Sequence, residues 1–166
     1  MRLTRMRAAP FMTAGALLVA APGRIAAADA AGAFAACEAQ IAAQPQSREA
    51  YRCLHLTARR QSQWDEGRRR LQAMLARTPA NEWARLALAG LEADLARPEA
   101  EPLFRQAIEA FAKAGQMAGE VRARLGLANA LARRGDLAGA DAELALANQV
   151  AEGVNTTKSA FLLAKR

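Results

Sequence analysis

One stripe of residues in the middle of the chain constrains its fold more than any other feature. The stripe consists of Trp64, Gly67, Leu71, Met74 and Pro79. Spacings of three and four residues place the first four on one face of a helix. The proline ends that unit, because proline is tolerated poorly inside a helix. The pattern therefore predicts an amphipathic helix with one small residue among large apolar ones.

A second stripe, made of Tyr51, Leu54 and Ala58, predicts a partner helix just upstream. Together the two stripes resemble the tetratricopeptide repeat (TPR), a helix–turn–helix unit of about 34 residues that stacks on further copies of itself. In a repeat that starts at Arg48, His55 takes a position that the family usually gives to a small residue. We expect His55 to be a packed core residue rather than a catalytic one.

Two weaker copies of this pattern follow along the chain. The second contains Trp83, Leu86, Ala87 and Gly90, then Ala100, Phe104 and Ala107. The third contains Leu127, Ala128 and Leu131, then Ala140, Leu144 and Ala147. The resemblance implies an all-α fold, namely a right-handed α-solenoid of about three TPR-like helical hairpins with an N-terminal capping helix. A plain helical bundle is the alternative.

On this interpretation the chain has four segments. They are a signal peptide over residues 1–28, a capping helix over 29–45, TPR-like repeats over 46–152, and the start of a further or capping helix over 153–166. Residues 113–119 contain two glycines and are expected to form a long linker. Residues 150–157 are expected to interrupt the helix before the last segment.

The N-terminus has the features of a secretory signal. Three arginines within residues 1–7 precede an apolar run at 11–21, and the alanines at 26–28 match a cleavage pattern. We expect cleavage after Ala28 and a periplasmic or secreted protein. The run is shorter than the ~20 residues that a membrane-spanning helix needs, so we expect no stable membrane insertion after cleavage. An uncleaved anchor and lipidation at Cys37 are the alternatives.

The positive charge of the chain does not indicate nucleic-acid binding. The net charge is +7, but four of its arginines precede the predicted cleavage site. Without them about +3 remains, which is ordinary for a domain of this size. The run Arg68-Arg69-Arg70 points in several directions on a helix, so we expect a solvated face. No lysine-rich tail or interleaved aromatic residues suggest binding to bases.

Two cysteines lie symmetrically about a predicted helix break. Cys37 is eight residues before Pro45, and Cys53 is eight residues after it. At ~1.5 Å per residue, both lie at one height in an antiparallel hairpin. Because export places them in an oxidising compartment, we predict a disulfide. Two buried thiols that act as small apolar residues are the alternative.

The sequence contains no recognisable catalytic pattern. GxSxG, HExxH and P-loop motifs are absent, and the single histidine leaves little for a triad or a metal site. We therefore expect a protein that is not an enzyme and that has no cofactor and no metal site.

The resemblance implies peptide binding by the first helix of each repeat. Carried onto this chain, the predicted peptide-binding residues are Arg52, Leu56, Arg59, Arg60, Arg122, Asn129 and Arg133. Arginine dominates the set, and guanidinium groups suit carboxylates. The sharper hypothesis is therefore an acidic peptide or a C-terminal carboxylate.

The leading functional hypothesis is a non-catalytic protein–protein interaction scaffold in the bacterial cell envelope. A second hypothesis follows from the resemblance to N-terminal regions of larger exported proteins, including those with a caspase-like CHAT protease domain. The chain would then be the recognition arm of an enzyme. A third hypothesis is a self-associating structural protein. The patterns do not identify the partner or the oligomeric state.

Overall fold

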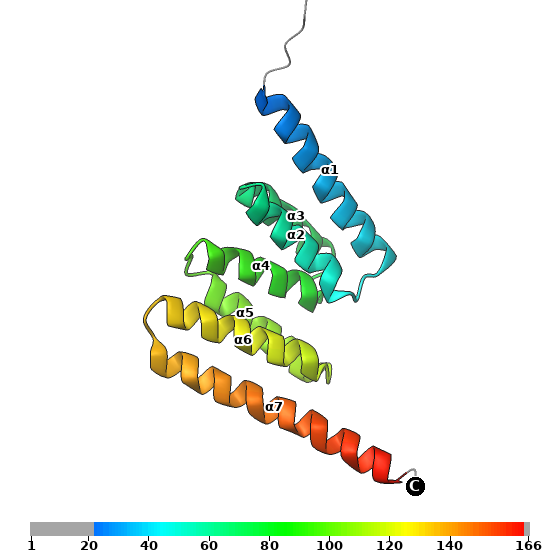
Figure 1. Cartoon of the computed structure of the whole chain (residues 1–166), viewed down its shortest axis with the longest axis vertical. Helices are drawn as coiled ribbons and strands as arrows, with labels where there is room; N and C mark the ends of the chain where they lie inside the picture. The colour runs from blue at the N-terminus through cyan, green and yellow to red at the C-terminus, as the bar shows by residue number, and fades with distance from the viewer. Residues whose placement is uncertain (1–21, 165–166) are drawn as a thin grey trace, which may run out of the picture.

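The computed structural model describes the backbone of residues 22–164 and the side chains of residues 31–153. Within that part the chain forms seven helices and no strand, which confirms the all-α prediction (Figure 1). The helices are α1 (Pro22–Ala43), α2 (Arg48–Arg60), α3 (Trp64–Arg77), α4 (Glu82–Asp94), α5 (Ala100–Lys113), α6 (Met117–Arg133) and α7 (Leu137–Ala164).

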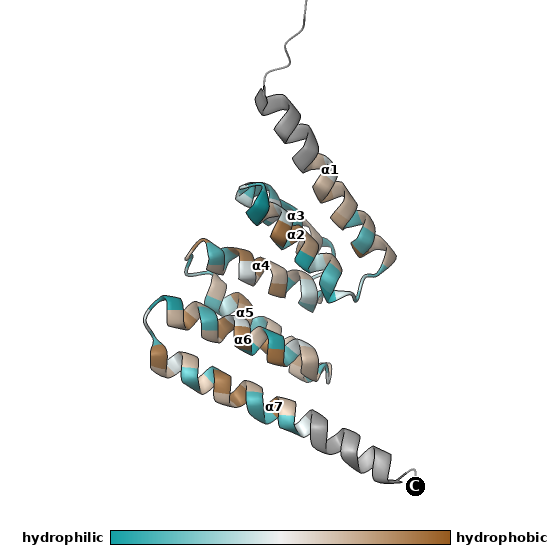
Figure 2. Ribbon diagram, in the orientation of Figure 1, coloured by the Kyte–Doolittle hydropathy of each residue, from teal (hydrophilic) through white to brown (hydrophobic). Residues whose placement is uncertain are grey.

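Consecutive helices pack against one another in chain order from α1 to α7 (Figure 1). Two further contacts join helices that are not consecutive: α2 also packs on α4, and α4 packs on α6. As a result, α2, α4 and α6 lie side by side. Figure 2 shows hydrophobic and hydrophilic residues intermixed along these helices rather than separated into large blocks.

Four helices end in the same way. The residue after each C-cap has a left-handed backbone, with φ of 54° at Ser62, 52° at Ala96, 66° at Gly115 and 88° at Gly135. The next amide then donates back across the final turn, as Asp136 N does to the Leu131 carbonyl at 3.0 Å. This Schellman arrangement satisfies carbonyls that the helix end leaves free. The turn that contains Gly135 joins α6 to α7, which begins at Leu137.

Two apolar clusters form the core, and α4 contributes to both. The first cluster draws on α1 to α4, and the second on α4 to α7. Gly67 of α3 lies against Ala58 of α2 and Leu91 of α4. A Cβ added there would be 2.5 Å from the Cβ of Ala58 and 3.0 Å from Leu91 Cδ1. The small residue of the opening stripe is therefore required by a helix–helix contact.

Two expected breaks are wrong. The linker predicted at 113–119 is only a short turn, because α5 ends at Lys113 and α6 begins at Met117. Gly115 forms the turn, whereas Gly119 is helical and buried against the Phe111 ring. The break predicted at 150–157 is absent, since the backbone of α7 continues through it to Ala164. The segment predicted at 153–166 therefore continues α7 as far as that residue.

The predicted capping helix over 29–45 overlaps most of α1, which begins earlier, at Pro22, and ends at Ala43. The Sγ atoms of Cys37 and Cys53 are 2.00 Å apart, at the distance of a disulfide bond, as predicted. Residues 1–21, which include most of the predicted signal peptide, lie outside the described residues. None of the helices in the described part is long and apolar enough to cross a membrane.

The solvated face expected for the three consecutive arginines is wrong for two of them. Arg68 donates from Nε and Nη2 to the buried Glu92, at 2.8 and 3.1 Å. Arg70 lies 2.8 Å from Glu38 of α1, and its guanidinium carbon is 5.0 Å from the Phe34 ring centroid. Only Arg69 is solvated, with 72% of its side chain exposed.

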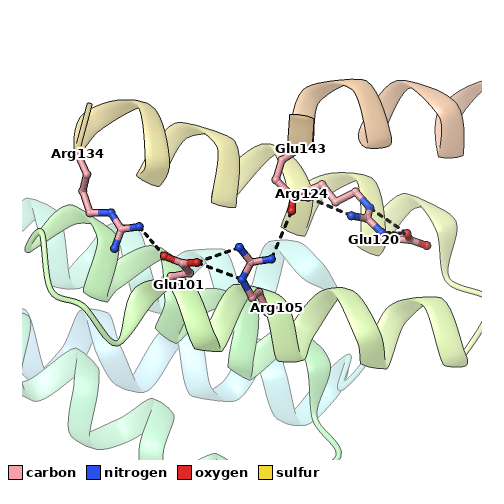
Figure 3. A network of polar contacts seen from close by, with 6 residues as sticks. All are labelled: Glu101, Arg105, Glu120, Arg124, Arg134 and Glu143. Carbon is pink, nitrogen blue, oxygen red and sulfur yellow. Dashed lines mark hydrogen bonds and ion pairs between the residues drawn. The ribbon is translucent and has the colours of Figure 1, made fainter. Parts of the chain in front are cut away.

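A polar network joins α5, α6 and α7 beside the second apolar cluster (Figure 3). Arg124 donates to Glu120 within α6 and to Glu143 of α7, at 2.8 and 3.0 Å. Glu101 of α5 accepts from Arg105 of the same helix at 2.9 Å and from Arg134, which follows α6. These contacts fix the last three helices relative to one another.

Candidate functional site: an arginine-lined cleft

A cleft of about 400 Å³ lies between α2, α4 and α6. Each of these three helices gives it a set of side chains spaced at helical intervals. Five of the residues that line it are arginines: Arg48, Arg52, Arg59, Arg122 and Arg133. The single carboxylate among the lining residues is Asp94. The cleft is therefore strongly cationic.

Six of the seven predicted peptide-binding residues line this one cleft. They are Arg52, Leu56, Arg59, Arg122, Asn129 and Arg133. The seventh, Arg60, is exposed on α2 and lies outside the cleft. Arg60 does not reach the cleft because it follows Arg59 directly, and consecutive residues of a helix point in different directions. The positions implied by the resemblance thus lie together on α2 and α6, with this one exception.

Three arginines gather at one end of the cleft. Arg48 and Arg52 come from the first turns of α2, and Arg122 comes from α6. Partial burial lowers the pKa of Arg122, and repulsion from Arg48 and Arg52 lowers it further, with Glu49 acting in the opposite direction. The charges of Arg48 and Arg52 are therefore close enough to destabilise that of Arg122.

Asp94 lies at the other end of the cleft and contacts three cationic or polar partners. Its carboxylate is 3.0 Å from Nε2 of His55, 3.2 Å from Nη1 of Arg133 and 4.0 Å from Nη1 of Arg59. Only 19% of the Asp94 side chain is exposed. Sequence reasoning missed Asp94, because a carboxylate in the last turn of a helix looks like an ordinary surface residue.

His55 is partly buried, with 20% of its side chain exposed, and it lines the cleft instead of belonging to either apolar cluster. Its ring packs on Gly90, where an added Cβ would be 2.9 Å from His55 Cε1. Gly90 on α4 thus supplies the space that the histidine takes on α2. A small residue is thus absent at position 55 of α2, but Gly90 of the neighbouring α4 provides one.

Apolar side chains line the middle of the cleft. Leu56 comes from α2, Leu86 from α4 and Leu125 from α6. Trp83 is held in place by Phe111, with ring centroids 4.7 Å apart. Tyr51 is fixed through its hydroxyl, which donates to the Pro45 carbonyl at 3.0 Å and accepts from Asn81 at 2.7 Å. Packing and hydrogen bonds thus preorganise the wall of the cleft.

The cleft offers positive charge and apolar contact. Among the described residues, no group of three or more histidine, cysteine, aspartate or glutamate side chains is placed to hold a metal ion. No protein-family model, curated protein or solved structure matches this chain. Its function is therefore proposed from the cleft itself.

Proposed function

We propose that this protein is a non-catalytic protein–protein interaction scaffold that binds a partner peptide in the cleft between α2, α4 and α6. The observation that carries the proposal is the convergence of five arginines from two helices on one preorganised cleft. Guanidinium groups are well suited to carboxylates because they donate in a planar fork. Leucine and tryptophan side chains between them suit the apolar parts of a peptide.

We further propose that the helices form a TPR-type solenoid. The first helices of the three hairpins begin at Arg48, Glu82 and Met117, spacings of 34 and 35 residues. The lateral contacts of α4 with both α2 and α6 are those expected when hairpins stack in a regular series. A plain bundle has no reason to repeat its helix starts at this period.

Export to the bacterial envelope is the setting that we propose for this binding. The arginine-flanked apolar run within residues 1–21 supports it, and so does the cysteine pair at disulfide distance. Fractionation of cells that make the full chain tests the location. Recovery of the intact, uncleaved chain from the cytoplasm would contradict it.

Partner capture from an envelope extract tests the binding face. The test variant carries Arg52→Glu, Arg59→Glu and Arg133→Glu, which reverse three charges in the cleft. A matched control reverses Arg69, Arg77 and Lys113, which are exposed and lie outside the cleft. We expect the first variant to lose its partners and the control to retain them, provided that both show the wild-type helical circular dichroism. Unchanged capture by the first variant would contradict the proposal.

Two alternative functions stay predictions. If the chain is the recognition arm of a larger exported enzyme, the open reading frame should continue beyond Arg166. If the protein self-associates, the exposed Leu137, Leu144 and Leu146 of α7 are available for it. Sedimentation across a range of protein concentrations distinguishes a self-associating protein from a monomer.

A further inference from the structure

The five arginines of the cleft fall into two groups that differ in what neutralises them. Arg59 and Arg133 both contact Asp94, at 4.0 and 3.2 Å. By contrast, Arg52 and Arg122 have no ion pair within the described part of the chain. Arg48 has only Glu49, at 3.8 Å, and 71% of that glutamate side chain is exposed. One end of the cleft therefore has a partly buried carboxylate shared by two arginines, whereas the other end has only the exposed Glu49 beside three.

The direction of the helices keeps the two groups apart. Arg59 and Arg133 lie in the last turns of α2 and α6, and Asp94 ends α4. Arg48 begins α2, and Arg122 lies five residues after the start of α6. At ~1.5 Å per residue, Arg52 and Arg59 are about 10 Å apart along the α2 axis. Arg122 and Arg133 are about 16 Å apart along α6 by the same measure.

We propose that the cleft is polarised: Arg48, Arg52 and Arg122 bind a peptide carboxylate, and Asp94 excludes anions from the opposite end. Asp94 is then a specificity-determining residue, because it occupies the guanidinium groups that a second carboxylate would need. This inference rests on the proposed peptide-binding function and adds the position of the ligand's negative charge. An extended segment of about three to five residues spans the distance between the two ends.

The electrostatics of the cationic end support this assignment. A bound carboxylate removes the repulsion that Arg122 experiences from Arg48 and Arg52. It also gives Arg52 and Arg122 hydrogen-bond acceptors, which the described residues of the free protein do not supply. At the other end, an incoming carboxylate meets the negative charge of Asp94, which already accepts a hydrogen bond from Arg133 and lies 4.0 Å from Arg59. Like charges at close range cost affinity and thereby set register.

Fluorescence anisotropy with labelled tetraglutamate tests the polarity, with labelled tetraglutamine as the neutral control. The first variant carries Arg52→Gln and Arg122→Gln, and the second carries Arg59→Gln and Arg133→Gln. Each removes two positive charges from the cleft, so long-range attraction falls equally. We expect the first to weaken tetraglutamate binding about ten-fold or more and the second less than about two-fold.

A third variant, Asp94→Asn, tests the exclusion directly and keeps the shape of the side chain. It releases Arg59 and Arg133, so we expect it to bind tetraglutamate several-fold more tightly than wild type. Thermal unfolding of each variant confirms that it is folded. If the variant lacking Arg59 and Arg133 does not fold, Asp94→Asn alone decides the question.

Three outcomes would overturn the proposal. They are equal losses in the two double variants, no gain in Asp94→Asn, and no preference of the wild type for tetraglutamate over tetraglutamine. None of them contradicts peptide binding in the cleft, which the capture experiment judges separately. Capture that depends on the cleft, together with any of these results, would retain the binding face and reject its polarity.

Discussion

Arg68 and Arg69 are adjacent in sequence, yet only Arg68 neutralises a buried carboxylate. Glu92 has 4% of its side chain exposed and receives two hydrogen bonds from Arg68. Arg97 is a more distant third partner at 3.6 Å. Arg69 pairs with Glu66 at the surface. A charge is costly to bury without a partner, whereas a surface pair contributes little.

Replacing these two arginines one at a time should therefore give very different losses of stability. We expect Arg68→Met to lower the free energy of unfolding by about 3 kcal/mol, because it leaves the Glu92 carboxylate buried with only a distant partner. Arg69→Met should cost less than about 1 kcal/mol. Urea unfolding measures both. Similar losses in the two variants would contradict the distinction, and Glu92→Leu added to Arg68→Met should restore part of the loss.

The role of a single residue is also the hardest feature to predict from the sequence. Gly115 and Gly119 look alike in the sequence and suggest one flexible linker. In the structure Gly115 has a positive φ and open space around it, whereas Gly119 is helical and packs on Phe111. A glycine that ends a helix and a glycine that admits a neighbouring ring give the same local signal. Only the partner helix distinguishes them.

At the scale of elements, α1 packs mainly on α2. Phe34 and Cys37 are its two buried residues among those with described side chains. Arg70 adds a link to α3 through Glu38 and the Phe34 ring. Most of the remaining described side chains of α1 are exposed alanine, glycine or glutamine. The apolar contact that holds this helix is therefore small.

We expect the cysteine pair to supply much of the stability of α1. The two cysteines are separated by 16 residues, and closing a loop of this size contributes about 3 kcal/mol in the chain-entropy model. Replacement of both by serine should lower the free energy of unfolding by about that amount and increase hydrogen exchange first in α1. Reducing agent should destabilise the wild type but not the double variant. Equal sensitivity of the two proteins would contradict a disulfide.

The network of α5, α6 and α7 contains the carboxylate with the clearest change in acidity. Hydrogen bonds from Arg134, and then from Arg105, lower the pKa of Glu101 below its ordinary value of 4.5, although burial opposes them. The pKa of Glu101 is lower in the folded state than in the unfolded state. Its contribution to the stability of the fold is therefore fully present when the pH is above the ordinary pKa of the residue. It is lost as the pH falls through the folded-state value.

Glu101→Gln should therefore make the stability of the protein less sensitive to acid. We expect its free energy of unfolding to fall less than that of wild type between about pH 6 and about pH 3. Glu109→Gln is the matched control, because Glu109 is exposed on the same helix and has no ion pair among the described residues. Parallel pH profiles for Glu101→Gln and wild type would contradict the assignment. Denaturant unfolding at each pH provides the measurement.

At the scale of the whole molecule, α4 belongs to both apolar clusters. Leu91 and Leu88 face the first cluster, and Ala89 faces the second. The same helix contributes Trp83, Leu86 and Asp94 to the cleft. The two halves of the protein and the proposed binding face thus depend on the position of one helix. We expect the described part of the chain to unfold as one unit for that reason.

Leu91→Ala tests this coupling, because Leu91 is fully buried. We expect a loss of about 3 kcal/mol from the cavity, with a single unfolding transition and reduced protection from hydrogen exchange in α6 as well as α2. Leu137→Ala is the control, since that side chain is 65% exposed and should cost little. Loss of protection confined to α1–α3 would show that the two halves unfold independently.

The sequence was sufficient for the all-α fold, because that fold depends on helical periodicity. The residues expected to bind a peptide came from the resemblance to the tetratricopeptide repeat, and all of them except Arg60 line the cleft. The continuation of α7 was not predictable from its residues. Val150, Gly153 and Thr156 each disfavour a helix only modestly, by roughly 1 kcal/mol or less. Asp94 was missed because its partners lie 39 residues away on either side, at His55 and Arg133.

The contacts of Asp94 also indicate how wide the cleft is at that end. They show that the space between α2 and α6, above α4, is wide enough for one carboxylate group held from both sides at 3.2 and 4.0 Å. Arg52 and Arg122 come from the same two helices nearer their starts. A ligand carboxylate between Arg52 and Arg122 would thus be bound from both sides, in the way that Arg59 and Arg133 contact Asp94 in the free protein. The contacts of Asp94 therefore indicate the geometry that we propose for the bound ligand.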